Sequence, residues 1–169
     1  MNHVLACLIP AALIAEAAPS LERSHSEFTF HLDVPYPQAA PLFGALAEKK
    51  WDPEWNPEFL YPAPAADEEG SVFVIARNGH HSTWTTTVFD LERGHIQYLY
   101  FIEGVMVTRI DIHLSKPTSG GTDARVLYER TALDAAANAH VKTLGEHDGL
   151  QGPHWKQAIE KSVTCAPCK

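Results

Sequence analysis

Ten histidines and 21 acidic residues supply most of the side chains that could bind a metal or move a proton. His80 and His81 are neighbours on an expected strand, where adjacent side chains point to opposite faces, so they cannot easily share one ion. Three further histidines recur every seven residues on an expected helix, which glycine and proline interrupt before the last of them: His140, His147 and His154. No HExxH motif accompanies them, so we expect no metal site and no cofactor.

Proton transfer inside a cavity would need a histidine or a carboxylate that projects into it. His81 and Glu103 stand near the ends of expected strands, where a cavity mouth could include them, and they are the candidate catalytic residues. Arg109, Asp111 and His113 alternate with aliphatic residues and should face solvent if those aliphatic residues form the core. No P-loop, GxGxxG sequence or nucleophile elbow is present, which excludes the enzyme classes that depend on them.

Aromatic side chains give the clearest indication of a site for an apolar molecule. Trp51 and Trp55 lie four residues apart between prolines, and Phe59 follows them. Four more are spread over successive expected strands: Trp84, Tyr98, Tyr100 and Tyr128. Aromatic rings offer a ligand a large contact area, and a tyrosine hydroxyl can hold a single oxygen atom. We predict that these residues line a ligand cavity; the alternative for each of them is ordinary packing in the core.

The elements that must position these residues follow from hydrophobic periodicity. Alternating apolar residues from Phe28 to Val34 predict a half-buried strand, and a short helix is expected over 38–50. Turn sequences divide the following stretch into six strands: 58–61, 71–77, 81–91 (with Trp84, Thr86 and Val88 on one face), 95–102, 105–114 and 124–132. Residues 133–162 form the one long helical stretch, which is split in two by Gly149, Gly152 and Pro153.

Consecutive hairpins imply an antiparallel sheet, whose apolar face needs a cover. The C-terminal helix is the one expected element long enough to supply it. We therefore predict an α+β fold in which a curved antiparallel sheet of six to seven strands wraps around a long C-terminal helix, with short helices between the first two strands. An acidic loop over 64–70 should leave Asp67 exposed.

The succession of short motifs resembles the SRPBCC superfamily, the START-related and polyketide-cyclase-like helix-grip proteins, and in particular its uncharacterised bacterial members. The resemblance covers 26–163 and rests on these segments: Phe30 to Pro35, Leu42-Phe43, Glu48 to Trp55, Glu58 to Pro62, Glu68 to Phe73, Ser82-Thr83-Trp84, Arg109 to Leu114, Thr131-Ala132-Leu133 and Asn138-Ala139. It implies a helix-grip fold with a deep apolar cavity for lipids, sterols or polyketides. It transfers no catalytic residue, because the superfamily shares no catalytic signature.

Both ends of the chain need a separate interpretation. Residues 1–17 resemble a cleavable secretory signal that ends in Ala15-Glu16-Ala17, which indicates a periplasmic or secreted protein. The alternative is an apolar extension of a cytoplasmic domain. The tail 164–169 carries Cys165 and Cys168 after a helix rather than before one, so a small disulfide or two idle thiols is expected instead of a redox centre.

Length and charge narrow the classes of function. The 169 residues fit one domain, and a net charge of −8 without a basic cluster argues against binding to nucleic acid. No apolar run reaches the ~18–20 residues of a membrane span.

Three functions remain. The first is binding or carriage of a hydrophobic small molecule (lipid, sterol or polyketide-like) in an internal cavity, which needs apolar walls with one or two polar anchors. The second is a cavity enzyme of the polyketide cyclase/dehydratase type, which needs an acid–base pair with perturbed pKa values. The third is interaction with a protein partner. The sequence specifies neither the ligand nor the oligomeric state.

Overall fold

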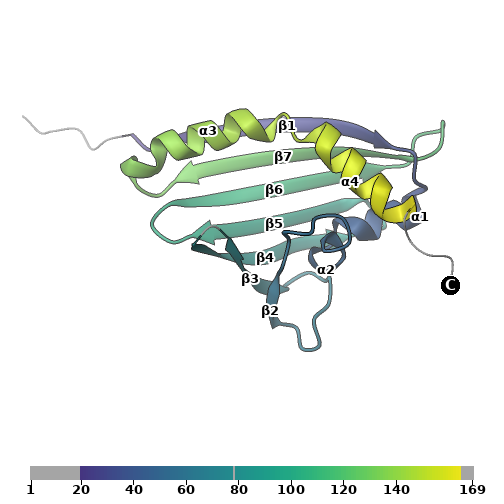
Figure 1. The fold of residues 1–169 in the computed structure, drawn as a ribbon, viewed down its shortest axis with the longest axis horizontal. Helices are drawn as coiled ribbons and strands as arrows, with labels where there is room; N and C mark the ends of the chain where they lie inside the picture. The colour runs from purple at the N-terminus through teal and green to yellow at the C-terminus, as the bar shows by residue number, and fades with distance from the viewer. Residues whose placement is uncertain (1–19, 78, 165–169) are drawn as a thin grey trace, which may run out of the picture.

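The computed structural model describes residues 20–77 and 79–164 as one antiparallel sheet with helices on one of its faces (Figure 1). In this part of the chain seven strands pair in the order β1-β7-β6-β5-β4-β3-β2. They are β1 Arg23–Leu32, β2 Glu58–Tyr61, β3 Val72–Arg77, β4 His80–Asp90, β5 His95–Ile102, β6 Met106–Ser115 and β7 Thr122–Ala132. The helices are α1 Tyr36–Ala39, α2 Ala45–Glu48, α3 Asn138–Asp148 and α4 Gly152–Thr164, with 3-10 turns η1 Ala40–Phe43 and η2 Ala135–Ala137. The α+β helix-grip fold expected from the sequence is confirmed.

Side chains alternate between the helix-covered face of the sheet, here called the concave face, and the opposite convex face. In β6 the residues Ile110, Ile112 and Leu114 are buried on the concave face. Arg109 and His113 are exposed on the convex face, and Asp111 between them is partly exposed. The predicted alternation of β6 is therefore confirmed, because a strand places successive side chains on opposite faces.

A β-bulge changes the faces of β4. Trp84 and Thr86 are buried on the concave face, but the register with β5 shifts between Thr86 and Val88. Val88 consequently pairs with Gln97 of the convex face, so the prediction that Val88 shares the face of Trp84 was wrong. An extra residue of this kind bends the strand and increases its twist, which helps the sheet to curve.

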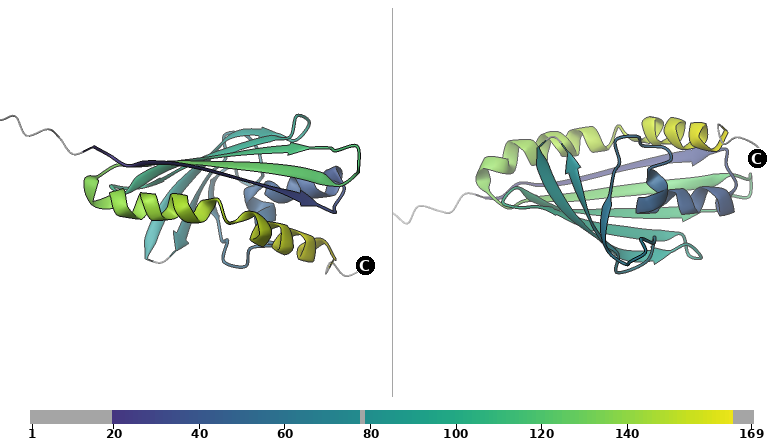
Figure 2. Two further views of the ribbon diagram at one scale, coloured as in Figure 1. Left: turned by 90° about the horizontal axis from the view of Figure 1, so that it is seen from above. Right: turned by 60° about the horizontal axis from the view of Figure 1, so that its bottom comes forward.

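The C-terminal helices lie along the β1 side of the concave face (Figure 2). Helix α3 packs on β1 and β7, and a Cβ atom at Gly145 would come within 2.5 Å of Ser24 Cβ, so glycine permits this close approach. Residues 149–151 separate α3 from α4, as the glycines and the proline in this region predicted.

The connection from β1 to β2 is more broken than the single helix expected over 38–50. Pro41 cannot donate a backbone hydrogen bond, and Gly44 is extended, so α1, η1 and α2 are separate short turns. The Asp67 carboxylate accepts a hydrogen bond from the Leu46 backbone at 2.8 Å and so caps α2 from the acidic loop. The expectation that Asp67 is exposed was therefore wrong: it is half-buried against α2.

The possible signal sequence at 1–17 and the Cys165/Cys168 pair lie outside the described residues. None of the helices in 20–77 and 79–164 is both long enough and apolar enough to cross a membrane.

Candidate functional site

A cavity of about 660 Å³ opens between the concave face, the junction of α3 and α4, and the segment that follows α2. Strand residues such as Ile110 and Met106 form its floor, and Leu144 of α3 faces them. This volume lies within the range of sites for small molecules, ~300–1,000 Å³. All four tryptophans of the chain line it: Trp51, Trp55, Trp84 and Trp155.

The aromatic wall of the cavity is held in place by its own contacts. Trp84 stacks on Tyr100 with ring centroids 4.0 Å apart, and Trp55 meets Trp84 edge-on at 5.2 Å. The indole N–H groups of Trp51 and Trp55 donate to backbone carbonyls of Leu42 and Ala45, both at 2.7 Å. Because each indole has its hydrogen-bond partner in the protein, the wall is preformed and presents its apolar ring surface to the cavity.

The structure brings five of the seven predicted ligand-binding residues to this cavity: Trp51, Trp55, Trp84, Tyr100 and Tyr128. Tyr98 does not line it, because its buried hydroxyl donates to the Phe43 carbonyl at 2.9 Å beneath the aromatic wall. Phe59 does not line it either, and instead stacks on Phe73 at 5.2 Å near the edge of the sheet. For Tyr98 and Phe59 the alternative, ordinary packing, describes the structure better.

The candidate catalytic residues lie elsewhere. His81 is exposed on β4 and points away from the face of its neighbour His80, which does line the cavity. Glu103 is exposed in the tight turn between β5 and β6. Of the three histidines spaced by seven residues, His140 and His154 line the cavity while His147 is exposed at the end of α3. No acid–base role for His81 or Glu103 in the cavity follows from this arrangement.

A buried polar network that the sequence did not reveal forms one wall of the cavity. The Arg130 guanidinium on β7 donates from Nε and Nη2 to the Asp148 carboxylate on α3, at 2.6 and 2.8 Å. Its Nη1 donates to Thr108 Oγ1 at 3.1 Å and to the Tyr100 hydroxyl. Arg130 and Asp148 are only 5% and 7% exposed, so each depends on the other for neutralisation. The ion pair fastens the end of α3 to the sheet.

Tyr128 lines the cavity beside this network. The Arg130 guanidinium carbon lies 4.9 Å from the centroid of the Tyr128 ring, within the range of a cation–π contact. Burial raises the pKa of the Tyr128 hydroxyl, although the charge of Arg130 opposes that effect, so the phenol stays protonated at neutral pH. No described residue hydrogen-bonds to this hydroxyl, which leaves it able to bind an oxygen atom of a ligand.

Glu48, the last residue of α2, is a third lining residue that the sequence did not predict. Burial raises the pKa of its carboxyl well above the ordinary value of 4.5, and the nearby charges of Asp52 and Asp67 add to that effect. No described residue forms a hydrogen bond with its side chain. The arrangement therefore favours the neutral acid, which is a form able to donate a proton or a hydrogen bond.

Sequence reasoning missed Glu48, Arg130 and Asp148. For Arg130 a signal was present, because the period of two places it on the same face of β7 as Tyr128. Burial of Asp148 depends on how α3 packs on the sheet. Glu48 is partly exposed, and its raised pKa depends on desolvation and on the charges of Asp52 and Asp67, which only the fold brings near it. Neither has a local sequence pattern.

Among the described residues, the side chains that could hold a metal ion together do not lie in the cavity. A group of two histidines and a carboxylate lies instead on the convex face: His95, Asp111 and His113. The cavity therefore offers an apolar wall, a neutralised polar network, one free phenol and one acid of raised pKa.

Comparison with known proteins supports the fold. No protein-family model matches the chain, and no curated protein matches its sequence. Norcoclaurine synthase from Thalictrum flavum superposes with a TM-score of 0.63 at 12% identity, over 98% of this chain and 99% of that one. Ara h 8.0201 gives 0.62 at 15% identity, over 84% and 98%. CalU16 from Micromonospora echinospora gives 0.56 at 13%, over 88% and 87%.

At these identities the likeness shows the fold alone. One structure of the Thalictrum synthase is a complex with dopamine and hydroxybenzaldehyde, which is a property of that protein. The neighbours support the helix-grip fold of this chain and assign no residue of it a role.

Proposed function

We propose that this protein is an SRPBCC-type binding or carrier protein for a hydrophobic small molecule that carries a neutral oxygen group, such as an alcohol, a sterol or a ketone. The observation that carries the proposal is the 660 Å³ cavity walled by tryptophans, with Tyr128 in its lining. The similar fold of the Thalictrum synthase, one structure of which holds dopamine and hydroxybenzaldehyde, supports the proposal by analogy.

The charges around the cavity favour a neutral ligand over an anionic one. The charge of Arg130 is already neutralised by Asp148, so Arg130 offers little attraction to a carboxylate. Glu54 is likewise paired with Arg77, which also lines the cavity, so neither of them counts. Asp52 remains, and Glu48 joins it when ionised; both line the cavity and would repel an anion. A long-chain alcohol should therefore bind more tightly than the fatty acid of equal length.

The test is a titration with Nile red, a neutral hydrophobic dye, followed by competition with 1-dodecanol and with dodecanoate. We expect dye fluorescence to rise on binding and dodecanol to displace the dye at lower concentration than dodecanoate does. Leu144→Trp should weaken binding, because Leu144 lines the cavity and the larger ring would fill part of it. Leu150→Trp is the matched control, since Leu150 is 73% exposed and does not line the cavity. Equal dye affinities for the two variants would place the dye elsewhere on the protein and contradict the proposal.

A second candidate function is a cavity enzyme of the cyclase or dehydratase type, and Glu48 is the observation that favours it. An acid with a raised pKa beside an aromatic cavity suits general acid catalysis. Glu48 would give its proton to the leaving hydroxyl, which departs as water, while Tyr128 holds the ketone oxygen. The Glu48 carboxylate would then take up the α-proton of the ligand, which restores the acid. The discriminating measurement is turnover: a set of polyketide-like β-hydroxy ketones should be dehydrated by the wild type and not by Glu48→Gln, whereas a carrier leaves them unchanged.

Export of the chain through the signal-like sequence at 1–17 remains part of the proposal. A carrier in the periplasm or outside the cell would move its ligand between membranes or cells. Mass spectrometry of the mature protein from its native host tests this, since an intact 1–17 segment would contradict it.

A further inference from the structure

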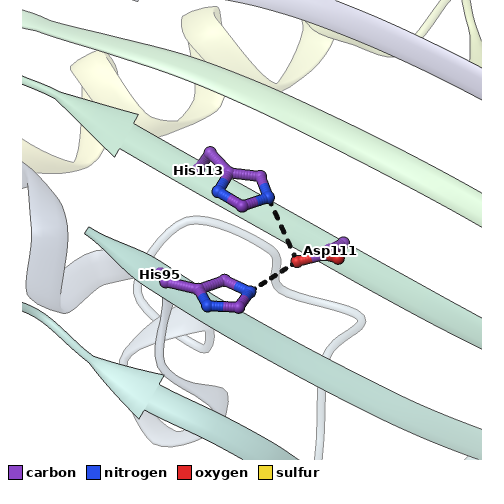
Figure 3. Close-up of side chains that lie close together, drawn as sticks. All are labelled: His95, Asp111 and His113. Carbon is purple, nitrogen blue, oxygen red and sulfur yellow. Dashed lines mark hydrogen bonds and ion pairs between the residues drawn. The ribbon is translucent and has the colours of Figure 1, made fainter. Parts of the chain in front are cut away.

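We propose a second binding site, for a divalent transition-metal cation such as Zn²⁺, on the convex face of the sheet, with His95, Asp111 and His113 as its ligands (Figure 3). It lies on the face opposite the cavity, so it goes beyond the proposed function and does not depend on it.

The strand pairing brings the three side chains to one spot. Asp111 and His113 are two residues apart on β6, so both project from the convex face. His95 on β5 is the direct cross-strand partner of His113, and the two imidazole rings stack with centroids 4.7 Å apart. The positions of Asp111, His113 and His95 are therefore fixed by β5 and β6, two central strands of the sheet.

The donor atoms already converge. Asp111 Oδ1 lies 2.7 Å from His95 Nε2 and 3.3 Å from His113 Nε2, and all three donor atoms lie within 4.8 Å of one another. Around a tetrahedral ion with bonds of about 2.0–2.1 Å, ligand atoms are separated by roughly 3.3 Å. Small side-chain rotations would reach that spacing, and His113 has room for them because its side chain is 47% exposed.

The residues around Asp111 orient its carboxylate, and the nearby arginines form their ion pairs with other carboxylates. The Gln97 amide donates to Asp111 Oδ2 at 3.1 Å, which orients the carboxylate and leaves Oδ1 toward the imidazoles. The nearest arginine in register, Arg125, is engaged by a two-point ion pair with Glu27 at 2.7 Å. Arg109 on the same strand pairs with Glu129.

The donor set selects the class of ion. Two imidazoles and one carboxylate suit Zn²⁺, Co²⁺, Ni²⁺ and Cu²⁺, whereas Mg²⁺ and Ca²⁺ require mostly oxygen ligands. Three protein ligands leave at least one position for water, because the site is open to solvent on the convex face. A bound ion would join β5 to β6 and thereby stabilise the folded protein.

The experiment is calorimetric titration of the folded protein with ZnCl₂ at neutral pH, after alkylation of the three cysteines, which would otherwise compete for zinc. We expect one site per chain, with affinity lowered at least about tenfold in each of His95→Gln, His113→Gln and Asp111→Asn. His25→Gln is the matched control, because His25 is another convex-face histidine, 3.6 Å from Glu129, and belongs neither to the proposed ligands nor to the surface pocket beside His113. Its zinc affinity should equal that of the wild type.

Absence of zinc binding, or equal zinc affinity in all four variants, would overturn the proposal and leave the three side chains as a hydrogen-bonded surface group. A second readout on the wild type avoids dependence on the variants. Imidazole ¹⁵N resonances should show Nε2 of His95 and His113 shifting on addition of Zn²⁺, and unchanged resonances would overturn the proposal equally.

Discussion

The ion pair between Arg130 and Asp148 offers a sharp test of how the cavity wall is held together. Asp148→Leu would leave the Arg130 guanidinium buried without its counterion, while Thr108 and Tyr100 provide only neutral hydrogen-bond acceptors. Removing one partner of a buried ion pair typically costs about 3–5 kcal/mol in the free energy of unfolding. For a protein of this size the melting temperature should fall by about 6–20 °C. Arg130→Met should have a cost of the same order.

The double variant Arg130→Met with Asp148→Leu separates the free energy of the ion pair from the packing lost in each single variant. Replacement of both partners by apolar residues of similar size is often neutral or stabilising, so Arg130→Met with Asp148→Leu should recover most of the lost stability. Urea unfolding of the four proteins gives the coupling free energy from a double-mutant cycle, which we expect to be about 3 kcal/mol. Single variants that each cost under about 1 kcal/mol, with additive effects, would refute the idea that the pair fastens α3 to the sheet.

Three further outcomes follow from the same structure. Burial raises the pKa of Glu48 in the folded protein, so the contribution of Glu48 to stability should fall as pH rises above 4.5 and level off above the folded-state pKa. Glu48→Gln should lack this loss, so its melting temperature relative to the wild type should rise with pH, and a constant difference from pH 4 to 9 would contradict the prediction. Gly145→Ala should lower the free energy of unfolding by about 1–3 kcal/mol, because the added Cβ would overpack against Ser24; the better helix propensity of alanine offsets part of this loss. Gly149→Ala should be neutral or stabilising in chemical denaturation, because its Cβ would meet only an ordinary contact. Ser24→Ala should stabilise by about 1–3 kcal/mol, because Ser24 Oγ is buried without a hydrogen-bond partner among the described residues, and an unchanged unfolding midpoint would show that water satisfies it.

Local periodicity was sufficient to predict most of the sheet. Segment 58–61 and segment 95–102 coincide with β2 and β5, because turn residues bound each of them: Pro57 and Pro62 for the first, Gly94 and Gly104 for the second. The face of Val88 was predicted wrongly, since a bulge in β4 has no pattern in a single strand and appears only through its partner. The burial of Asp67 was missed for a related reason, since it arises from a loop that folds back on α2.

The site residues likewise divide into those with a local sequence pattern and those that only the contacts between elements bring together. Trp51 and Trp55 could be found because closely spaced aromatics between prolines are conspicuous in any chain. His95, Asp111 and His113 could not be grouped from the sequence, because β5 and β6 become neighbours only through the register of the sheet. Asp148 was hidden for the same reason: its partner Arg130 lies 18 residues away on a different element.

The central claim, that an apolar molecule occupies the cavity between sheet and helices, is tested most directly by NMR of the indole N–H groups. All four tryptophans line that cavity, so their four indole resonances report on its interior. On titration with 1-dodecanol we expect these resonances to shift together with one saturating dependence on concentration, while the backbone amide of exposed Leu150 stays unchanged. Indole resonances that remain fixed, up to the solubility limit of the alcohol, would contradict the account.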